Sequence, residues 1–215
     1  LWPHKSKPEN RTLAGARAQV AQWDASGAAP AVQLRLPALF NSHRTMRGET
    51  AAFLDLAEGN EVLRRSLDRM TEFNEAMIDL AAKTLGDRLD LVGLAEELGM
   101  QTGLMYSPDT IRREFLPRLG RLFDRAHRRG YKVFYHSCGA IEPLIGELIE
   151  MGVDVLNPIQ PRLPGMDPEH LAARFGGRVC FCGGIDMQHL LPQGKPEEVR
   201  REVERYIRCL GPGYI

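Results

Sequence analysis

The sequence predicts an α/β protein whose core is a parallel β-sheet. Strand-like and helix-like patterns alternate along the chain, with short loops between them. Such alternation is typical of βα units, whose right-handed crossovers place successive strands parallel. An open doubly wound sheet and a (β/α)8 barrel both fit this pattern. The last units are compact, no GxGxxG motif follows the first strand and no Walker loop is present, so the pattern favours the barrel.

The elements can be placed from periodicity and capping residues. The candidate strands are residues 31–36, 89–94, 131–137, 153–157 and 179–183. The longest helical pattern, residues 61–85, repeats apolar side chains on roughly one face, namely Leu63, Leu67, Met70, Met77, Ala81 and Leu85. Ser107-Pro108 and Asp167-Pro168 each pair a capping side chain with proline at the first helical position, so each predicts a helix start. A last helix is expected from Pro196 to a stop at Gly211.

Length and composition narrow the class of protein. The chain has 215 residues, 43% of them hydrophobic, which fits a single globular domain over residues 1–215. Lysine plus arginine and aspartate plus glutamate both number 28, so the charge balance gives no sign of nucleic-acid binding. No apolar run approaches the ~20 residues of a membrane span, so we expect no membrane partner. Four cysteines are too few for a disulfide scaffold, which favours reduced thiols and a cytoplasmic protein.

The two ends of the chain predict a piece of a longer protein. There is no initiator methionine, and Gly211-Pro212-Gly213 looks like a turn before the first residues of another strand, Tyr214-Ile215. We therefore expect a barrel that is truncated at both ends.

One strand end offers half of a metal site. A β-rich run leads into His136-Ser137-Cys138-Gly139, and a helical pattern follows it. Side chains two apart on a strand point the same way, so His136 and Cys138 are expected to project together. Imidazole and thiolate are ligands that zinc prefers, and the carboxyl ends of strands are where α/β proteins build their sites. We therefore predict that His136 and Cys138 bind zinc; a hydrogen-bonded polar pair is the alternative.

Several segments together resemble the uroporphyrinogen decarboxylase superfamily. Residues 90–101 are similar to its DDLG.Q segment, with Glu96-Glu97 in place of the two aspartates. Residues 135–139 resemble its HSCG strand end, 152–160 its GVDILNPVQ segment, 181–186 its F.GGID segment, and 47–56 its RG.E..L.DLA segment. The resemblance implies a (β/α)8 barrel, present from about strand three to the start of strand eight.

The superfamily has two chemical branches, and the resemblance favours one of them. The HSCG strand end is similar to that of the corrinoid-linked methyltransferases, in which a zinc-bound thiolate moves methyl groups between a corrinoid and a thiol. The resemblance thus implies zinc, a thiol or tetrapyrrole substrate, and a corrinoid that is a substrate or is carried by a corrinoid protein. One alternative is decarboxylation of a porphyrinogen. Another is a non-catalytic barrel that binds a tetrapyrrole or corrinoid.

Other residues at strand ends complete the expected site. Cys182 is the candidate third zinc ligand, whereas Cys180 and Cys209 are expected to be apolar fillers. Of the adjacent Glu96 and Glu97, at most one can face the barrel interior, and we favour Glu97 as a zinc ligand or a proton shuttle. Asp186 could bind substrate or cap the next helix, and is the second candidate catalytic residue. Further predictions are that Asn157 and Gln160 bind polar substrate or cofactor groups, and that four other histidines lie at the surface or cap helices, namely His43, His127, His170 and His189.

Overall fold

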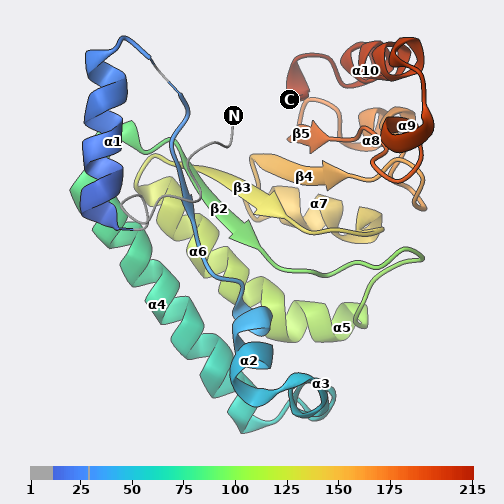
Figure 1. Ribbon diagram of the computed structural model, residues 1–215. Helices are drawn as coiled ribbons and strands as arrows, with labels where there is room; N and C mark the ends of the chain where they lie inside the picture. Colours follow the sequence, from blue (N-terminus) through green and yellow to red (C-terminus); the bar gives the residue numbers. More distant parts are fainter. Residues whose placement is uncertain (1–11, 29) are drawn as a thin grey trace.

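The computed structural model describes residues 12–28 and 30–215, and a parallel sheet runs through them (Figure 1). Its strands are β1 Gln33–Arg35, β2 Leu91–Ala95, β3 Lys132–His136, β4 Val155–Ile159 and β5 Cys180–Gly183. Their spatial order is β1-β2-β3-β4-β5, and every neighbouring pair is parallel. A doubly wound sheet would reverse direction at a switch point, whereas a barrel adds each strand beside the last. The predicted fold, part of a (β/α)8 barrel, is confirmed.

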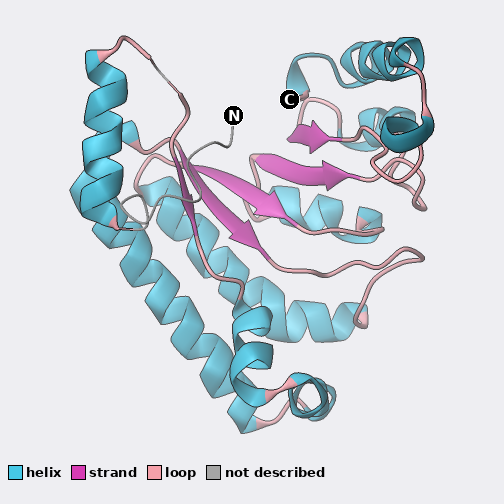
Figure 2. Cartoon of the chain, viewed as in Figure 1, coloured by secondary structure: helices cyan, strands magenta, loops and turns pink. Residues whose placement is uncertain are grey.

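Helices connect the strands (Figure 2). Those of eight residues or more are α1 Leu13–Ala25, α2 Leu39–Arg47, α3 Glu49–Glu58, α4 Glu61–Leu85, α6 Leu116–Arg128, α7 Glu142–Glu150, α8 Pro168–Phe175 and α10 Pro196–Leu210. Shorter turns are α5 Pro108–Thr110, α9 Leu190–Gln193 and the 3₁₀ segments Gly86–Arg88 and Gly211–Gly213. Within the two described ranges, no helix combines the length and apolar character needed to cross a membrane.

Helix α4 follows the sequence prediction from its first to its last residue. The Asn60 side chain accepts a hydrogen bond from the Leu63 amide at 3.0 Å, which caps the amino end. Leu63, Leu67 and Ala81 are fully buried, as their spacing indicates. Helices α4 and α6 run side by side and are joined by ion pairs such as Arg118–Asp68 at 2.7 Å and Arg121–Glu75 at 2.8 Å.

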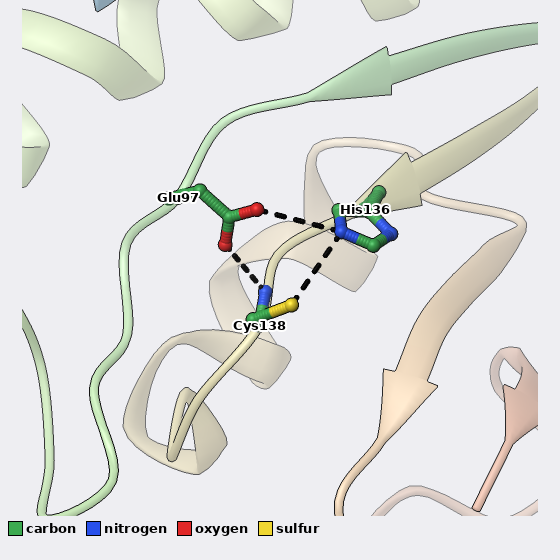
Figure 3. A group of neighbouring side chains, drawn as sticks. All are labelled: Glu97, His136 and Cys138. Atoms are coloured by element: carbon green, nitrogen blue, oxygen red, sulfur yellow. Dashed lines mark hydrogen bonds and ion pairs between the residues drawn. The ribbon is translucent and has the colours of Figure 1, made fainter. Parts of the chain in front are cut away.

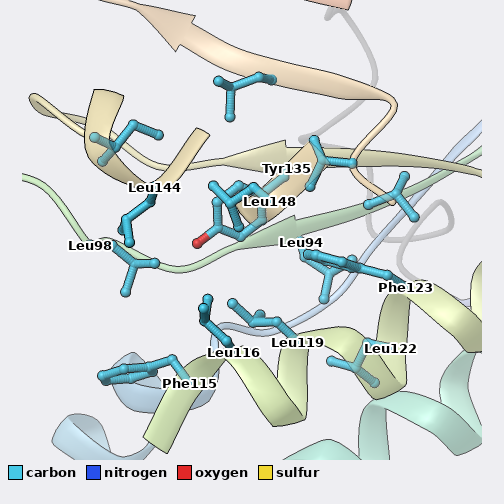
Figure 4. Close-up of a cluster of buried hydrophobic side chains, with 14 of the residues drawn as sticks. Leu94, Leu98, Phe115, Leu116, Leu119, Leu122, Phe123, Tyr135, Leu144 and Leu148 are labelled. Atoms are coloured by element: carbon cyan, nitrogen blue, oxygen red, sulfur yellow. The ribbon is translucent and has the colours of Figure 1, made fainter. Parts of the chain in front are cut away.

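The core lies between the sheet and helices α6 and α7 (Figure 4). Leu119 and Phe123 point from α6 toward the strands, and Tyr135 of β3 meets Phe123 edge-on with ring centroids 5.9 Å apart. Leu144 and Leu148 of α7 close the other end of the same cluster. This packing fixes β3 and the turn that follows it.

The helix expected after Ser107-Pro108 is interrupted. Ser107 Oγ accepts from the Thr110 amide at 3.1 Å as predicted, but residues Ile111–Phe115 form a π-helical turn before α6 begins. Pro117 has no N–H to donate to the carbonyl of Arg113, four residues earlier, so the helix widens there.

The last residues extend the sheet as expected. The Ile215 amide donates to the Phe181 carbonyl at 2.9 Å and the Gly183 amide donates to the Ile215 carbonyl at 3.1 Å. Tyr214 thereby forms a parallel bridge with Phe181. The four cysteines are free thiols, also as predicted.

Candidate metal centre

The carboxyl ends of β2, β3 and β4 bring polar side chains together. In the parallel register His136 stands opposite Ala95 on one side and Asn157 on the other. Glu97 lies two residues beyond Ala95, and Cys138 lies two residues beyond His136. Side chains two apart on extended backbone share a face, so three neighbouring strands deliver their polar groups to one point.

Three of these side chains form a compact group (Figure 3). The Cys138 Sγ lies 3.6 Å from His136 Nε2, and Glu97 Oε1 lies 3.4 Å from the same nitrogen. One sulfur, one imidazole nitrogen and one carboxylate oxygen thus lie within 4.8 Å of one another, close enough to bind a single metal ion. The side chains of His136 and Glu97 are 30% and 45% exposed, which leaves the group open to a ligand from solvent.

Backbone contacts hold the turns that carry these residues. The Cys138 amide donates to Glu97 Oε2 at 2.7 Å, so the other carboxylate oxygen faces His136. Ser137 is fully buried, and its hydroxyl accepts from the Leu98 amide at 2.9 Å. Gly139 has a φ of +93°, a conformation that favours glycine. The positions of Glu97 and Cys138 are therefore coupled.

The neighbours of His136 favour a proton on its Nε2 atom, which lies beside the Cys138 sulfur and the Glu97 carboxylate. Hydrogen bonds that the protonated ring donates to Cys138 and Glu97 raise the pKa of His136 to about 10, against the opposing effect of burial. In turn, the hydrogen bond from His136 is the main cause that lowers the pKa of Glu97. The raised pKa favours the protonated imidazole when no metal is bound, with the Nε2 proton facing the sulfur and the carboxylate. A bound cation would replace that proton.

Glu96 and Glu97 do point to opposite sides, as the strand geometry requires. Glu96 is 3% exposed and caps α2, accepting from the amides of Leu39 at 2.7 Å and Phe40 at 3.1 Å. Burial raises the pKa of Glu96 to about 7, although the two backbone hydrogen bonds oppose the shift. Glu96 therefore anchors a helix, and Glu97 is the carboxylate at the site.

Asn157, Gln160 and Cys182 lie around the group. Asn157 Oδ1 is 2.7 Å from His136 Nδ1, and its Nδ2 donates to Cys182 Sγ at 3.3 Å. Gln160 Oε1 accepts from the Gly139 amide at 2.5 Å. Both amide side chains thus bind the protein itself, and their predicted contacts with substrate stay a prediction. Cys182 is outside the three-residue group, and its predicted ligation of zinc also stays a prediction.

Asp186 has the capping arrangement that the sequence offered as one of its two roles. Its Oδ1 accepts from the amides of Gln188 at 2.8 Å and His189 at 3.1 Å, just before α9. Arg162 and His189 flank its other oxygen at 3.6 and 3.3 Å. A catalytic role for Asp186 stays a prediction.

The prediction for His43 was wrong. Its side chain is not at the surface: the residue is 2% exposed, stacks on Phe40 and lies 3.2 Å from the buried carboxylate of Asp55. The sequence feature that indicates this burial is the spacing of His43, which follows the buried Leu39 and Phe40 by four and three residues and so lies on the same face of α2. The other three histidines are partly exposed, and each pairs with an acidic residue, as His127 does with Asp154 at 2.7 Å.

Comparison with known proteins identifies the family. The sequence profile described as "Uroporphyrinogen decarboxylase (URO-D)" matches residues 43–215. The chain belongs to the URO-D family. The match includes Glu97, His136 and Cys138, so the candidate metal centre lies within the URO-D part of the chain. No match was found among curated proteins.

A solved structure supports the fold of this URO-D chain. That structure is of a methyltransferase from Methanosarcina mazei, to which this chain is similar with a TM-score of 0.72 and 16% sequence identity. The alignment covers 94% of the URO-D chain but 56% of the methyltransferase, so the chain spans little more than half the length of that protein. At this level of identity the similarity shows a shared fold.

Proposed function

We propose that this URO-D family chain is part of a cytoplasmic methyltransferase that moves a methyl group between a corrinoid and a small-molecule thiol, with zinc at the group of Glu97, His136 and Cys138. The observation that carries the proposal is the convergence of a thiol, an imidazole and a carboxylate within 4.8 Å. The family profile alone fits decarboxylation equally well. Porphyrinogen decarboxylation, however, gives no reason for a cysteine and a histidine to share one strand end.

The three side chains are of the types that zinc binds, and the contacts around them also suit a zinc site. Zinc binds thiolate sulfur, imidazole nitrogen and carboxylate oxygen, and a catalytic site keeps one position free for substrate. Glu97, His136 and Cys138 would supply three ligands, one of each type. Metal-binding imidazoles usually hydrogen-bond through their other nitrogen, as His136 does with Asn157 at 2.7 Å. The partial exposure of His136 and Glu97 leaves room for a substrate atom.

Bound zinc would lower the pKa of a substrate thiol and hold it as a nucleophilic thiolate. The residues of the chain do the positioning: Cys138 and His136 fix one side of the group, and the Cys138 amide turns the Glu97 carboxylate toward it. Methyl transfer to the thiol forms a carbon–sulfur bond and breaks the carbon–cobalt bond, whose electron pair stays on the corrinoid. The thiol proton leaves to solvent through the exposed side of the site.

The activity can be tested with methylcobalamin and a simple thiol such as 2-mercaptoethanol. We expect the purified protein to demethylate the corrinoid, followed by its absorption spectrum. His136→Ala should lower the rate by at least about tenfold, with a smaller effect on corrinoid binding, because the imidazole serves thiol activation and not docking. Cys209→Ser is the matched control, since Cys209 lies on α10 and contacts Glu169 away from the site. Loss of carboxyl groups from uroporphyrinogen, unaffected by changes at His136 or Cys138, would contradict the proposal.

A further inference from the structure

We infer that Asn157 is a positioning residue that selects the tautomer of His136, so that Nε2 is the nitrogen offered to the metal. The functional meaning of this inference rests on the proposed zinc site. The contacts from which it is argued are present without any metal.

The backbone places Asn157 beside His136. The two residues are register partners of the parallel strands β3 and β4, and the Ser137 amide donates to the Asn157 carbonyl at 3.0 Å. Side chains at such paired positions lie on the same face of the sheet. The Asn157 Oδ1 therefore meets His136 Nδ1 at 2.7 Å, on the side of the ring away from Cys138.

The orientation of the Asn157 amide follows from its second neighbour. Asn157 Nδ2 is 3.4 Å from the Cys182 carbonyl oxygen and 3.3 Å from Cys182 Sγ. A carbonyl oxygen can only accept a hydrogen bond, so the amide atom that faces it is the NH₂ group. The oxygen of Asn157 is then the atom that faces His136.

That orientation leaves one tautomer for the neutral ring. An amide oxygen has no proton to donate, so His136 Nδ1 must carry the hydrogen of the 2.7 Å contact. When the ring loses its second proton, the lone pair is consequently on Nε2, which is the nitrogen beside Cys138 and Glu97. The opposite tautomer would set two lone pairs against each other at Asn157 and aim a proton at the metal position.

Cys182 acquires a defined role from the same contacts. Its carbonyl and thiol hold the Asn157 amide in the orientation that His136 needs. This role differs from direct ligation of zinc, and the two have different consequences. Cys182→Ala keeps the carbonyl acceptor, so the orientation of Asn157 should survive it.

The test compares Asn157→Leu, Asn157→Asp and Cys182→Ala with wild type, using metal-free and zinc-loaded protein. Leucine removes the acceptor at similar size, whereas aspartate restores an oxygen opposite Nδ1. We expect Asn157→Leu to weaken zinc binding by roughly 10–100-fold. The zinc affinities of Asn157→Asp and Cys182→Ala should each stay within about fivefold of the wild-type affinity. Thermal unfolding of each variant reports whether it is folded.

Nitrogen-15 NMR of the histidine rings supplies a readout that does not need zinc. In metal-free wild type we expect the Nδ1–H proton of His136 to exchange slowly with solvent, and this exchange should stay slow in Asn157→Asp and become fast in Asn157→Leu. A wild-type His136 without that proton would overturn the inference, as would equal zinc affinity for the leucine and aspartate variants. If Cys182→Ala weakens zinc binding as much as Cys138→Ser does, Cys182 is a ligand and its orienting role is wrong. Failure of wild type to bind zinc, with the Nδ1–H proton present, would reject the proposed function and leave the Asn157 contact intact.

Discussion

Gly99 and Gly139 are in direct backbone contact, and this contact joins the two turns that carry Glu97 and Cys138. A Cβ atom added at Gly139 would lie 2.3 Å from the carbonyl carbon of Gly99, and one added at Gly99 would lie 2.6 Å from the carbonyl oxygen of Cys138. The Ala140 amide donates across the same contact to the Met100 carbonyl at 2.8 Å. The spacing of the candidate metal ligands therefore depends on two residues that have no side chain.

Gly139→Ala should separate the two turns. We expect it to lower the free energy of unfolding by about 2–4 kcal/mol, the sum of a left-handed backbone penalty and a steric clash. Gly177→Ala is the matched control, because Gly177 has a φ of +74° but no atom within 4 Å of an added Cβ. Urea denaturation of both variants measures the difference. Equal destabilisation by the two substitutions would show that the Gly99–Gly139 contact has no energetic importance.

The buried carboxylate of Asp55 should make the free energy of unfolding depend on pH in the acidic range. Hydrogen bonds from Arg47 at 2.8 Å and Asn60 at 2.8 Å lower the pKa of Asp55 to about 2. A carboxyl with a lowered pKa stabilises the folded state above the pKa of the unfolded chain, near 4, and this stabilisation is lost as the pH falls toward 2.

Asp55→Asn should therefore be less stable than wild type at pH 7, with a difference that shrinks between pH 5 and pH 2. The urea midpoint at each pH measures it. Asp24→Asn serves as the control, since Asp24 forms a half-exposed ion pair with Arg88. A pH-independent gap between Asp55→Asn and wild type would contradict the assignment.

Zinc binding should strengthen as the pH rises. The pKa of His136 is raised to about 10 by Cys138 and Glu97, so the ring holds a proton at neutral pH that zinc must displace. Each proton displaced weakens the affinity by about tenfold per unit decrease in pH below the pKa. Competition with a chromophoric chelator between pH 6 and pH 9 measures the slope, corrected for protonation of the chelator. An affinity that does not change over this range would exclude His136 as a ligand.

The sequence predicted the local part of this structure well. Alternating apolar patterns located the strands to within a few residues, because side-chain period and burial are properties of short segments. The repeat of apolar side chains gave the bounds of α4, residues 61–85. The spacing of His136 and Cys138 placed them on one face, and the opposed directions of Glu96 and Glu97 left Glu97 at the site. Each of these predictions needs only the geometry of a single strand or helix.

What the sequence could not supply depends on contacts between distant segments. Nothing near Asn157 in the chain indicates that its amide joins His136 to Cys182, since the register of three strands decides it. The burial of His43 depends on Asp55, twelve residues later in the next helix. The π-helical turn before α6 follows from Pro117. A proline at the same position would equally fit a simple kink of the helix, so the sequence does not distinguish the two.

The zinc content of the purified protein tests the central claim most directly. After purification of the full-length protein under reducing conditions, we expect about one zinc ion per chain in wild type and in Cys209→Ser. Cys138→Ser should lose most of its zinc, because a hydroxyl is a poor replacement for a thiolate ligand. Elemental analysis of the three proteins, each shown to be folded by circular dichroism, makes the comparison. Folded wild type without zinc, or Cys138→Ser with as much zinc as wild type, would contradict a metal centre at Glu97, His136 and Cys138.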